Sequence, residues 1–184
     1  MAQEKQDRRI RKTRALLQKG LIELMETKEI QNISVKELAD LTDINRGTFY
    51  LHYADVYDML HKMEEELFAE FNDILEHNLS KDGEKLDTHK RTLTEIFSFL
   101  EHHYDLARVM IGPRGDLAFV NRLKNLVKER LQHLLPAPRE AGEYYYAFLL
   151  SGCVGVIETW LNSPSPLPAE DMAELCSHML GSMI

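Results

Sequence analysis

Several features are missing from this 184-residue sequence, and each absence argues against a class of protein. No apolar run approaches the roughly 18 residues of a membrane span, and the start M-A-Q-E-K-Q-D-R-R lacks the apolar core of a signal peptide. We therefore expect a cytoplasmic protein without membrane contact. Only two cysteines occur, Cys153 and Cys176. Both lie in apolar helical surroundings, so we expect buried free thiols rather than a disulfide.

Motifs for catalysis or metal binding are also missing. The sequence has no G-x-S-x-G elbow, no glycine-rich phosphate loop and no C-x-x-C pair. Among the eight histidines only His102 and His103, with His89, lie near one another. Adjacent residues of a helix point about 100° apart, and surface histidines are commoner than ligands. Carboxylates such as Glu64 and Glu66 fall on a solvated helix face. We therefore expect no metal, no cofactor and no enzymatic activity.

The charge of the chain is unevenly distributed. A net charge of −8 argues at first against a nucleic-acid partner. Residues 1–53, however, hold ten Lys+Arg against eight Asp+Glu, which leaves −10 for the rest. The first nineteen residues alone carry seven basic and two acidic side chains. A basic arm on an acidic body is the asymmetry expected when only one end of a protein meets DNA phosphates.

Residues 34–53 predict two short helices that meet at an abrupt turn. Ser34 is a good N-cap, and Glu37 stands three residues later, as in a capping box. The apolar pattern then stops at Asp43, a residue type that tolerates the left-handed backbone conformation. Asn45 can cap a second helix directly afterwards. This arrangement indicates a helix-turn-helix.

The second of these helices combines an apolar face with a polar one. Phe49 and Tyr53, four residues apart, share the face that is turned toward the first helix. The polar residues around Gly47 are Arg46, Thr48, Tyr50 and His52. A guanidinium can pair with guanine, a threonine methyl can contact thymine, and a phenol or imidazole can reach phosphate oxygens. Two short helices with a tight turn occur in many helical proteins, so spacing alone leaves an ordinary half-buried surface open as well.

The literal sequence carries a resemblance. From Thr13 to about Leu60 the chain resembles the DNA-binding domain of TetR-family (TetR/AcrR-like) transcriptional regulators, through T-R-A-L-L, S-V-K-E-L-A and I-N-R-G-T-F-Y-L-H-Y. The resemblance implies base contacts from Arg46, Gly47 and Thr48, phosphate contacts from Tyr50 and His52, and flanking phosphate contacts from Thr13 and Val35. The partner that it implies is a double-stranded DNA operator.

Four positions depart from the pattern of that family. Gly20 stands where alanine is usual, and Glu29 and Asp43 stand where glycine is usual. Val56 occupies a position where a phosphate-binding lysine is frequent. Only the valine bears on function, because it removes one expected DNA contact.

The rest of the chain reads as helices only, which gives an all-α fold class. We expect a helix-turn-helix DNA-binding domain over residues 1–54 and a helical regulatory and dimerisation domain over residues 55–184. The expected helices are 8–28, the helix-turn-helix pair, 55–77, 93–103, 117–135, 140–161 and 170–183, with a loop over 78–87 and a break at 112–115.

The helix at residues 140–161 is apolar nearly all round, so one small monomer would not bury it completely. Its stretch G-x-x-G-x-I-x-x-W-L again looks like TetR-type regulators, whose last two helices form a four-helix dimer interface. We therefore expect a homodimer, with Gly152, Gly155, Leu175 and Met179 in the interface.

Aromatic and sulfur side chains of the second domain can line an apolar ligand cavity, although a stripe at helical spacing is more often plain core. These residues are Phe97, Tyr104, Met110, Tyr145, Phe148 and Trp160. The resulting hypothesis is a dimeric repressor that a small apolar or amphipathic effector releases from its operator. The alternatives are a regulator of the same fold that answers to a protein partner or activates transcription, and, more remotely, a helical enzyme.

Overall fold

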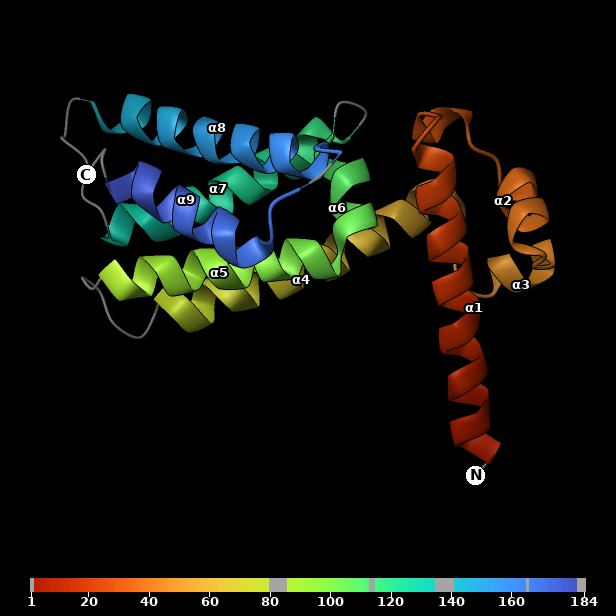
Figure 1. Cartoon of the computed structure of the whole chain (residues 1–184). Coiled ribbons are helices and arrows are strands. Elements are labelled where there is room, and N and C mark those ends of the chain that lie inside the picture. Colours follow the sequence, from red (N-terminus) through yellow and green to blue (C-terminus); the bar gives the residue numbers. More distant parts are fainter. Residues whose placement is uncertain (1, 80–85, 113–114, 135–140, 165, 182–184) are drawn as a thin grey trace. The chain divides into compact units, whose positions relative to one another are not determined.

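The computed structural model describes residues 2–79, 86–112, 115–134, 141–164 and 166–181. Within these ranges every regular element is a helix, and none is both long and apolar enough for a bilayer span. The chain forms two compact units, Met1–Glu66 and Leu67–Ile184. Helix α4 (Val56–Leu79) begins in the first unit and ends in the second (Figure 1). The division suggested by the sequence, between residues 54 and 55, lies at the start of this helix.

The first unit contains α1 (Ala2–Met25), the short 3-10 helix η1 (Ile30–Asn32), α2 (Val35–Thr42) and α3 (Arg46–Tyr50). The predicted N-caps and the left-handed residue are confirmed, but the carboxylate of Glu37 pairs with Lys28 and does not complete a capping box. Ser34 Oγ accepts a hydrogen bond from Glu37 N at 3.2 Å, and Asn45 Oδ1 accepts one from Gly47 N at 2.7 Å. Asp43 adopts φ 53° and ψ 37°, the left-handed conformation that ends α2. The α2–turn–α3 segment is therefore a helix-turn-helix whose ends are set by its own residues.

The core of the first unit gathers the inner faces of α1, α2, α3 and the start of α4. Its buried residues include Leu17, Leu21, Met25, Ile33, Leu38, Phe49, Tyr53, Val56, Met59 and Met63. Leu16 on α1 and Leu41 on α2, each near buried leucines of the same helix, are exposed. The reason is geometric, because Leu16 lies about 100° around the helix from Leu17, which faces the core.

Gly20 lies where α1 packs closely on α2, which explains why this position has no side chain. A Cβ atom at this position would lie 2.3 Å from Cγ2 of Thr42 and 3.0 Å from Cδ1 of Leu38. Thr42 is held in place because its hydroxyl donates a 2.8 Å hydrogen bond to the carbonyl oxygen of Leu38. The two helices therefore lie closer together than an alanine at position 20 would allow.

The second unit consists of the end of α4 with α5 (Leu86–His102), α6 (Tyr104–Ile111), α7 (Leu117–Leu134), α8 (Gly142–Leu161) and α9 (Ala169–Gly181). Helices α5 and α9 run side by side (Figure 1). Phe97 and Trp160 meet edge to face in the core, with ring centroids 5.4 Å apart. Trp160 Nε1 also donates a 2.7 Å hydrogen bond to Leu167 O, and Tyr104 OH donates one of 2.8 Å to Leu161 O. These polar atoms are therefore satisfied inside the core.

Several expected boundaries in this unit need correction. Helix α4 continues to Leu79 and α5 begins at Leu86, so both ends of the expected loop over 78–87 are helical. Residues 80–85, in the middle of that loop, lie outside the described residues. Helix α6 was not predicted, because neither glycine nor proline separates it from α5 and its N-cap, His103, makes no capping hydrogen bond through its side chain. Both cysteines are free, as expected, with Cys176 buried and Cys153 half-buried.

Candidate nucleic-acid interface and ligand cavity

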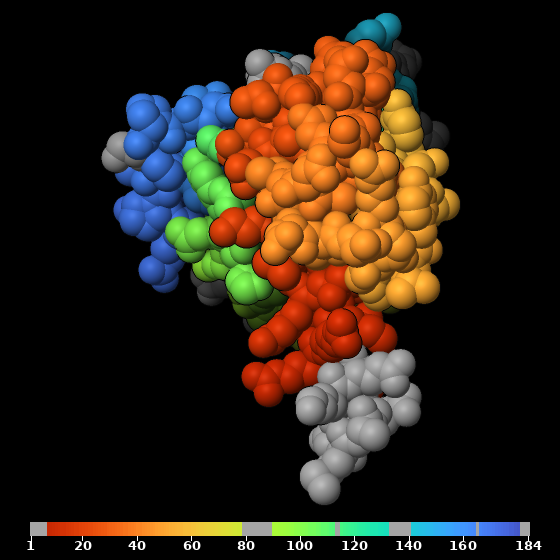
Figure 2. Space-filling view, turned by 90° about the vertical axis from the view of Figure 1, so that its right-hand side faces the viewer, coloured from red at the N-terminus to blue at the C-terminus, as the bar shows by residue number. Residues whose placement is uncertain are grey.

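Helix α3 is anchored on one face and open on the other. Phe49 and Tyr53 are buried, with ring centroids 5.6 Å apart. On the outer side Tyr50 is 57% exposed and Arg46 and Gly47 are exposed. Thr48 and His52 are half-buried beside them. Helices α2 and α3 form an open surface, orange in Figure 2, so the polar face of α3 is accessible to a partner.

The absence of a side chain at Gly47 leaves room for the N-cap of α3. A Cβ atom at this position would lie 3.1 Å from Asn45 Oδ1, the same oxygen that accepts the hydrogen bond from Gly47 N. A side chain here would therefore press on the cap. The bare backbone also leaves room beside Arg46 for a partner to approach closely.

The two flanking residues of the expected interface lie on other helices. Thr13 is half-buried on α1, and Val35 is half-buried as the first residue of α2. The first backbone N–H groups of a helix have no intrahelical partner, so position 35 is suited to a phosphate oxygen. The structure thus brings all seven expected DNA-binding residues into the first unit, on α1, the start of α2 and the α3 segment.

Arg14, which the sequence placed in the basic arm, is tied into the first unit. Its Nη2 lies 2.6 Å from Glu66 Oε1, and its Nε donates a 3.3 Å hydrogen bond to Tyr53 OH. The bond to Tyr53 raises the pKa of Arg14 against the opposing effect of burial. Arg14 is therefore a structural cation, whereas Arg8, Arg9, Arg11, Lys12 and Lys19 of the arm are exposed.

The start of α4 supports the end of α3. Lys62 Nζ donates hydrogen bonds to the carbonyl oxygen of His52 at 3.2 Å and to Asp58 Oδ2 at 2.8 Å. The bond from Lys62 is the main cause that lowers the pKa of Asp58. Asp55 caps α4, because its Oδ1 accepts a 2.8 Å hydrogen bond from Asp58 N, and Asp58 Oδ2 accepts one of 2.9 Å from Ala54 N. Val56, at the position where a lysine was expected, is only 4% exposed and packs in the core.

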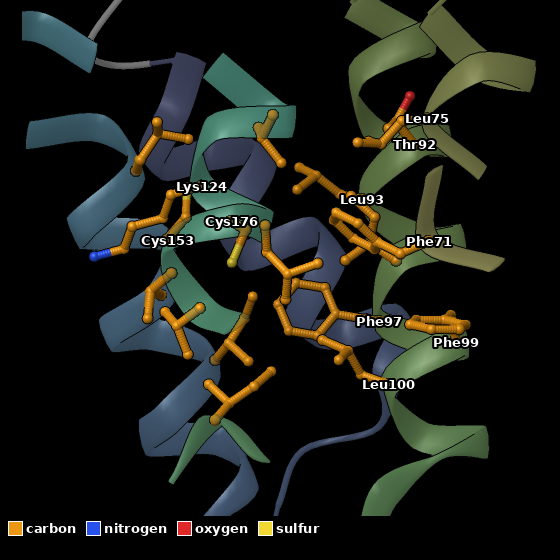
Figure 3. A pocket seen from close by; sticks show the side chains of 18 of the residues that line it. Phe71, Leu75, Thr92, Leu93, Phe97, Phe99, Leu100, Lys124, Cys153 and Cys176 are labelled. Carbon is orange, nitrogen blue, oxygen red and sulfur yellow. The ribbon is translucent and has the colours of Figure 1, made fainter. Parts of the chain in front are cut away.

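The second unit contains an apolar cavity of about 200 Å³ (Figure 3). Its wall is built by α4, α5, α7, α8 and α9 and by Ile111 at the end of α6, with Phe71, Phe97, Val127 and Ile157 among the other apolar residues. The only lining residues with a heteroatom in the side chain, among those described, are Thr92, Lys124, Cys153 and Cys176. This composition suits the apolar part of a small ligand.

Only one of the six expected pocket residues lines this cavity. Phe97 does so, whereas Tyr104, Met110 and Trp160 pack in the surrounding protein. Tyr145 is half-buried, and Phe148 is 68% exposed on α8. The reason is the direction of each helix face, because α8 turns Leu149, Leu150, Cys153, Val154 and Ile157 toward the cavity and Phe148 away from it. The apolar stripe of α4, which contributes Leu67, Phe71 and Leu75, was the signal that could have located the wall.

The four expected dimer residues lie on exposed parts of α8 and α9. A Cβ atom at Gly152 or Gly155 would meet no heavy atom of the described residues within 4 Å. Leu175 and Met179 are exposed on α9. On α8 the large side chains Tyr144 and Phe148, 79% and 68% exposed, extend the same face. Within the described part of the chain, no three potential metal ligands come together.

Comparisons with known proteins agree with this geometry. Residues 87–182 match the TetR-type family model described as a transcriptional regulator C-terminal region. The uncharacterized HTH-type transcriptional regulator YxbF of Bacillus subtilis is 25% identical over 170 residues, covering 87% of this chain. The chain spans only 42% of the length of that relative.

Two solved structures show the same fold. A TetR/AcrR-family transcriptional regulator from Aquifex aeolicus superposes with a TM-score of 0.70 at 14% identity, covering 94% of this chain and 99% of that chain. FadR from Bacillus subtilis, solved with stearoyl-CoA, superposes with a TM-score of 0.66 at 16% identity, covering 92% and 98%. Because the family model covers more than half of the sequence, the chain belongs to the TetR family of transcriptional regulators.

Proposed function

We propose that this protein is a cytoplasmic, dimeric repressor that binds a pseudo-palindromic operator and leaves it when a small apolar ligand binds the second unit. The main support for DNA binding is that α3 is anchored on one face and exposed on the other. Its buried Phe49 fixes the helix, while Arg46, Gly47 and Tyr50 are exposed on the other side. A helix held in this way can enter the major groove of DNA.

The exposed face of α8 and α9 supports a homodimer. Tyr144 and Phe148 expose large aromatic surfaces in line with two glycines that have open space in front of them. Contiguous apolar surface of this kind marks an interaction site, and small residues permit close approach of a second helix. A two-fold dimer would give two copies of α3 for two half-sites about one DNA turn apart.

The cavity supports control by a ligand. Three of its lining residues, Leu67, Phe71 and Leu75, belong to α4, and the first residues of α4 belong to the DNA-binding unit. A ligand that shifts α4 would therefore act on the helix that supports α3 through Lys62. The volume of about 200 Å³ is below the ~300 Å³ of a typical ligand pocket, so the effector would be small.

The alternative of a regulator that answers only to a protein partner would show a second unit with no cavity and with an exposed apolar patch. The second unit has such a patch on α8, which we assign to the dimer, but its cavity favours a small ligand. The sign of regulation is tested by deleting the gene, because transcription of the target rises when a repressor is lost and falls when an activator is lost.

The DNA-binding proposal is tested with the DNA that separates this gene from its neighbours. Fluorescence anisotropy at physiological salt would measure the affinity of the purified protein for that fragment and for a scrambled duplex of the same length. We expect at least a thousandfold preference, the low end of specific binding. Equal affinity for the two duplexes across every neighbouring intergenic fragment would contradict the proposal.

A further inference from the structure

The cavity contains very few groups that can recognise a polar ligand. Burial raises the pKa of the Cys153 thiol and raises that of Cys176 to about 11. Both are therefore uncharged thiols at neutral pH, and a neutral buried thiol behaves as a small apolar group. The hydroxyl-bearing Thr92 is buried. Among the described lining residues no acid is present, and Lys124 is the one charged side chain.

Lys124 differs from the other cations of α7. The Arg122 guanidinium lies 4.6 Å from the centre of the Phe68 ring, and Lys128 Nζ lies 2.6 Å from Glu143 Oε2. Arg130 donates a hydrogen bond to the side chain of Asn72 at 3.3 Å. Among the described residues, none forms a hydrogen bond or an ion pair with the Lys124 ammonium. The cation that borders the cavity is thus the one that α7 leaves available.

The position of the Lys124 side chain indicates where the charged part of a ligand would lie. Its aliphatic stem contributes to the cavity wall, and its ammonium points away from Phe97 and Phe99 (Figure 3). A lysine commonly buries its stem and keeps the ammonium in contact with water. The ammonium therefore ends on the outer side of the wall, opposite the side where Thr92 lies in the figure, and we call this end of the cavity its rim.

The size of the cavity limits the apolar part of the ligand. An apolar cavity of about 150 Å³ is large enough to bind benzene. A volume of about 200 Å³ therefore accommodates a single ring or a short chain of roughly six to eight carbon atoms. A long acyl chain would require the wall to repack.

We propose that the effector is a small apolar carboxylate whose hydrocarbon body fills the cavity and whose carboxylate is bound by the Lys124 ammonium at the rim. The neutral, apolar interior would penalise a charge placed deeper, whereas the rim offers a charge-assisted hydrogen bond. A cationic ligand would be repelled by the same side chain. The regulatory role of this ligand rests on the proposed function, but its binding does not.

The proposal is tested by calorimetric titration of the full-length protein with octanoate, 1-octanol and hexadecanoate. Octanoate and octanol have the same chain length, so the ratio of their affinities measures the contribution of the carboxylate charge to binding. In Lys124→Met this ratio should fall roughly fivefold, as for a partly exposed charge pair, with octanol binding unchanged. Lys128→Met, which removes the same charge from α7 outside the cavity, should leave the ratio as in the wild type.

Three results would overturn the proposal. The first is no octanoate binding at millimolar concentration, the second is an unchanged ratio in Lys124→Met, and the third is tighter binding of hexadecanoate than of octanoate. An equal loss of octanol and octanoate binding in Lys124→Met is one form of the second result, and it would mean that the lysine only supports the wall. Octanoate binding that depends on Lys124 but leaves the operator complex intact would support the site and contradict the proposed repressor mechanism.

Discussion

Arg46 and Tyr50 are both exposed on α3, but their side chains differ in what they can distinguish. A guanidinium that bonds both acceptors of guanine discriminates between bases, so Arg46→Ala should cost about 1–3 kcal/mol of operator binding and relax preference at one base pair per half-site. Titrations against the operator and single-base variants of it measure this loss. Operator binding that is unchanged in Arg46→Ala would refute the assignment of α3 as the reading helix.

Tyr50→Phe provides the matched comparison. It removes only a hydroxyl, which on our proposal bonds a phosphate oxygen, so all DNA sequences should be weakened alike. The salt dependence should barely change, because no charge is removed. Repeating the titrations at two salt concentrations separates the two variants. A changed base preference in Tyr50→Phe would mean that the phenol reads sequence after all.

Gly20 gives a prediction about stability. Alanine is a better helix former than glycine by about 1 kcal/mol, yet its Cβ would lie 2.3 Å from Thr42 Cγ2. Overpacking of this kind commonly costs about 1–3 kcal/mol, so Gly20→Ala should lower the free energy of unfolding. Denaturant titration measures the change.

The same contact supplies its own control. Thr42→Ser removes the methyl group that meets position 20 and keeps the hydroxyl that bonds the Leu38 carbonyl oxygen. The double variant Gly20→Ala/Thr42→Ser should therefore recover most of the loss. A single Gly20→Ala protein that is more stable than the wild type would show that α1 and α2 can move apart without cost.

At the scale of elements, the helix-turn-helix was predictable because its ends are set by neighbours in sequence. The Ser34 cap, the left-handed Asp43 and the Asn45 cap each act within three residues. Such short-range interactions do not depend on how the rest of the chain packs, so both helices could be placed from the sequence.

Other features depend on contacts between distant residues and could not be predicted. In the sequence Arg14 belongs to a basic segment, and only the fold brings Glu66, 52 residues away, next to it. The cavity wall joins residues of α4, α5, α6, α7, α8 and α9, so which face of each helix lines it depends on tertiary packing. Aromatic content was therefore a poor guide, and of the six expected residues only Phe97 lines the cavity.

Helix α8 gives a prediction at the scale of a whole element. On the face that we assign to the dimer, a Cβ atom at Gly155 would meet none of the described residues within 4 Å. Gly155→Arg should place a charged side chain in that interface, dissociate the dimer and lower operator affinity with it. Light scattering with size-exclusion chromatography measures the assembly.

Asn125→Arg, exposed on α7, introduces the same charge outside the proposed interface and should leave the dimer intact. A wild-type monomer at micromolar concentration would contradict the dimer itself. A dimeric Gly155→Arg protein would show that the interface uses another face.

At the scale of the whole molecule, α4 connects the two functions through a single continuous helix. Val56 and Met59, near its start, belong to the core of the first unit, and Leu67 and Phe71, farther along, belong to the cavity wall of the second. If a ligand displaces the cavity-lining residues of α4, the N-terminal end of the same helix must move or change direction as well, unless the helix bends. On our proposal, ligand binding and DNA binding therefore act on one shared element.

This connection predicts a reciprocal coupling between effector and operator. If octanoate lowers operator affinity by some factor, the operator must lower octanoate affinity by the same factor, because both changes close one thermodynamic cycle. Octanoate should also raise the unfolding temperature of the free protein, since it binds the folded state. Calorimetric titrations of octanoate with and without operator, and anisotropy titrations of operator with and without octanoate, measure the two factors independently. If octanoate stabilises the protein but both factors equal one, the protein binds the ligand and α4 does not transmit the effect of that binding to the DNA-binding unit.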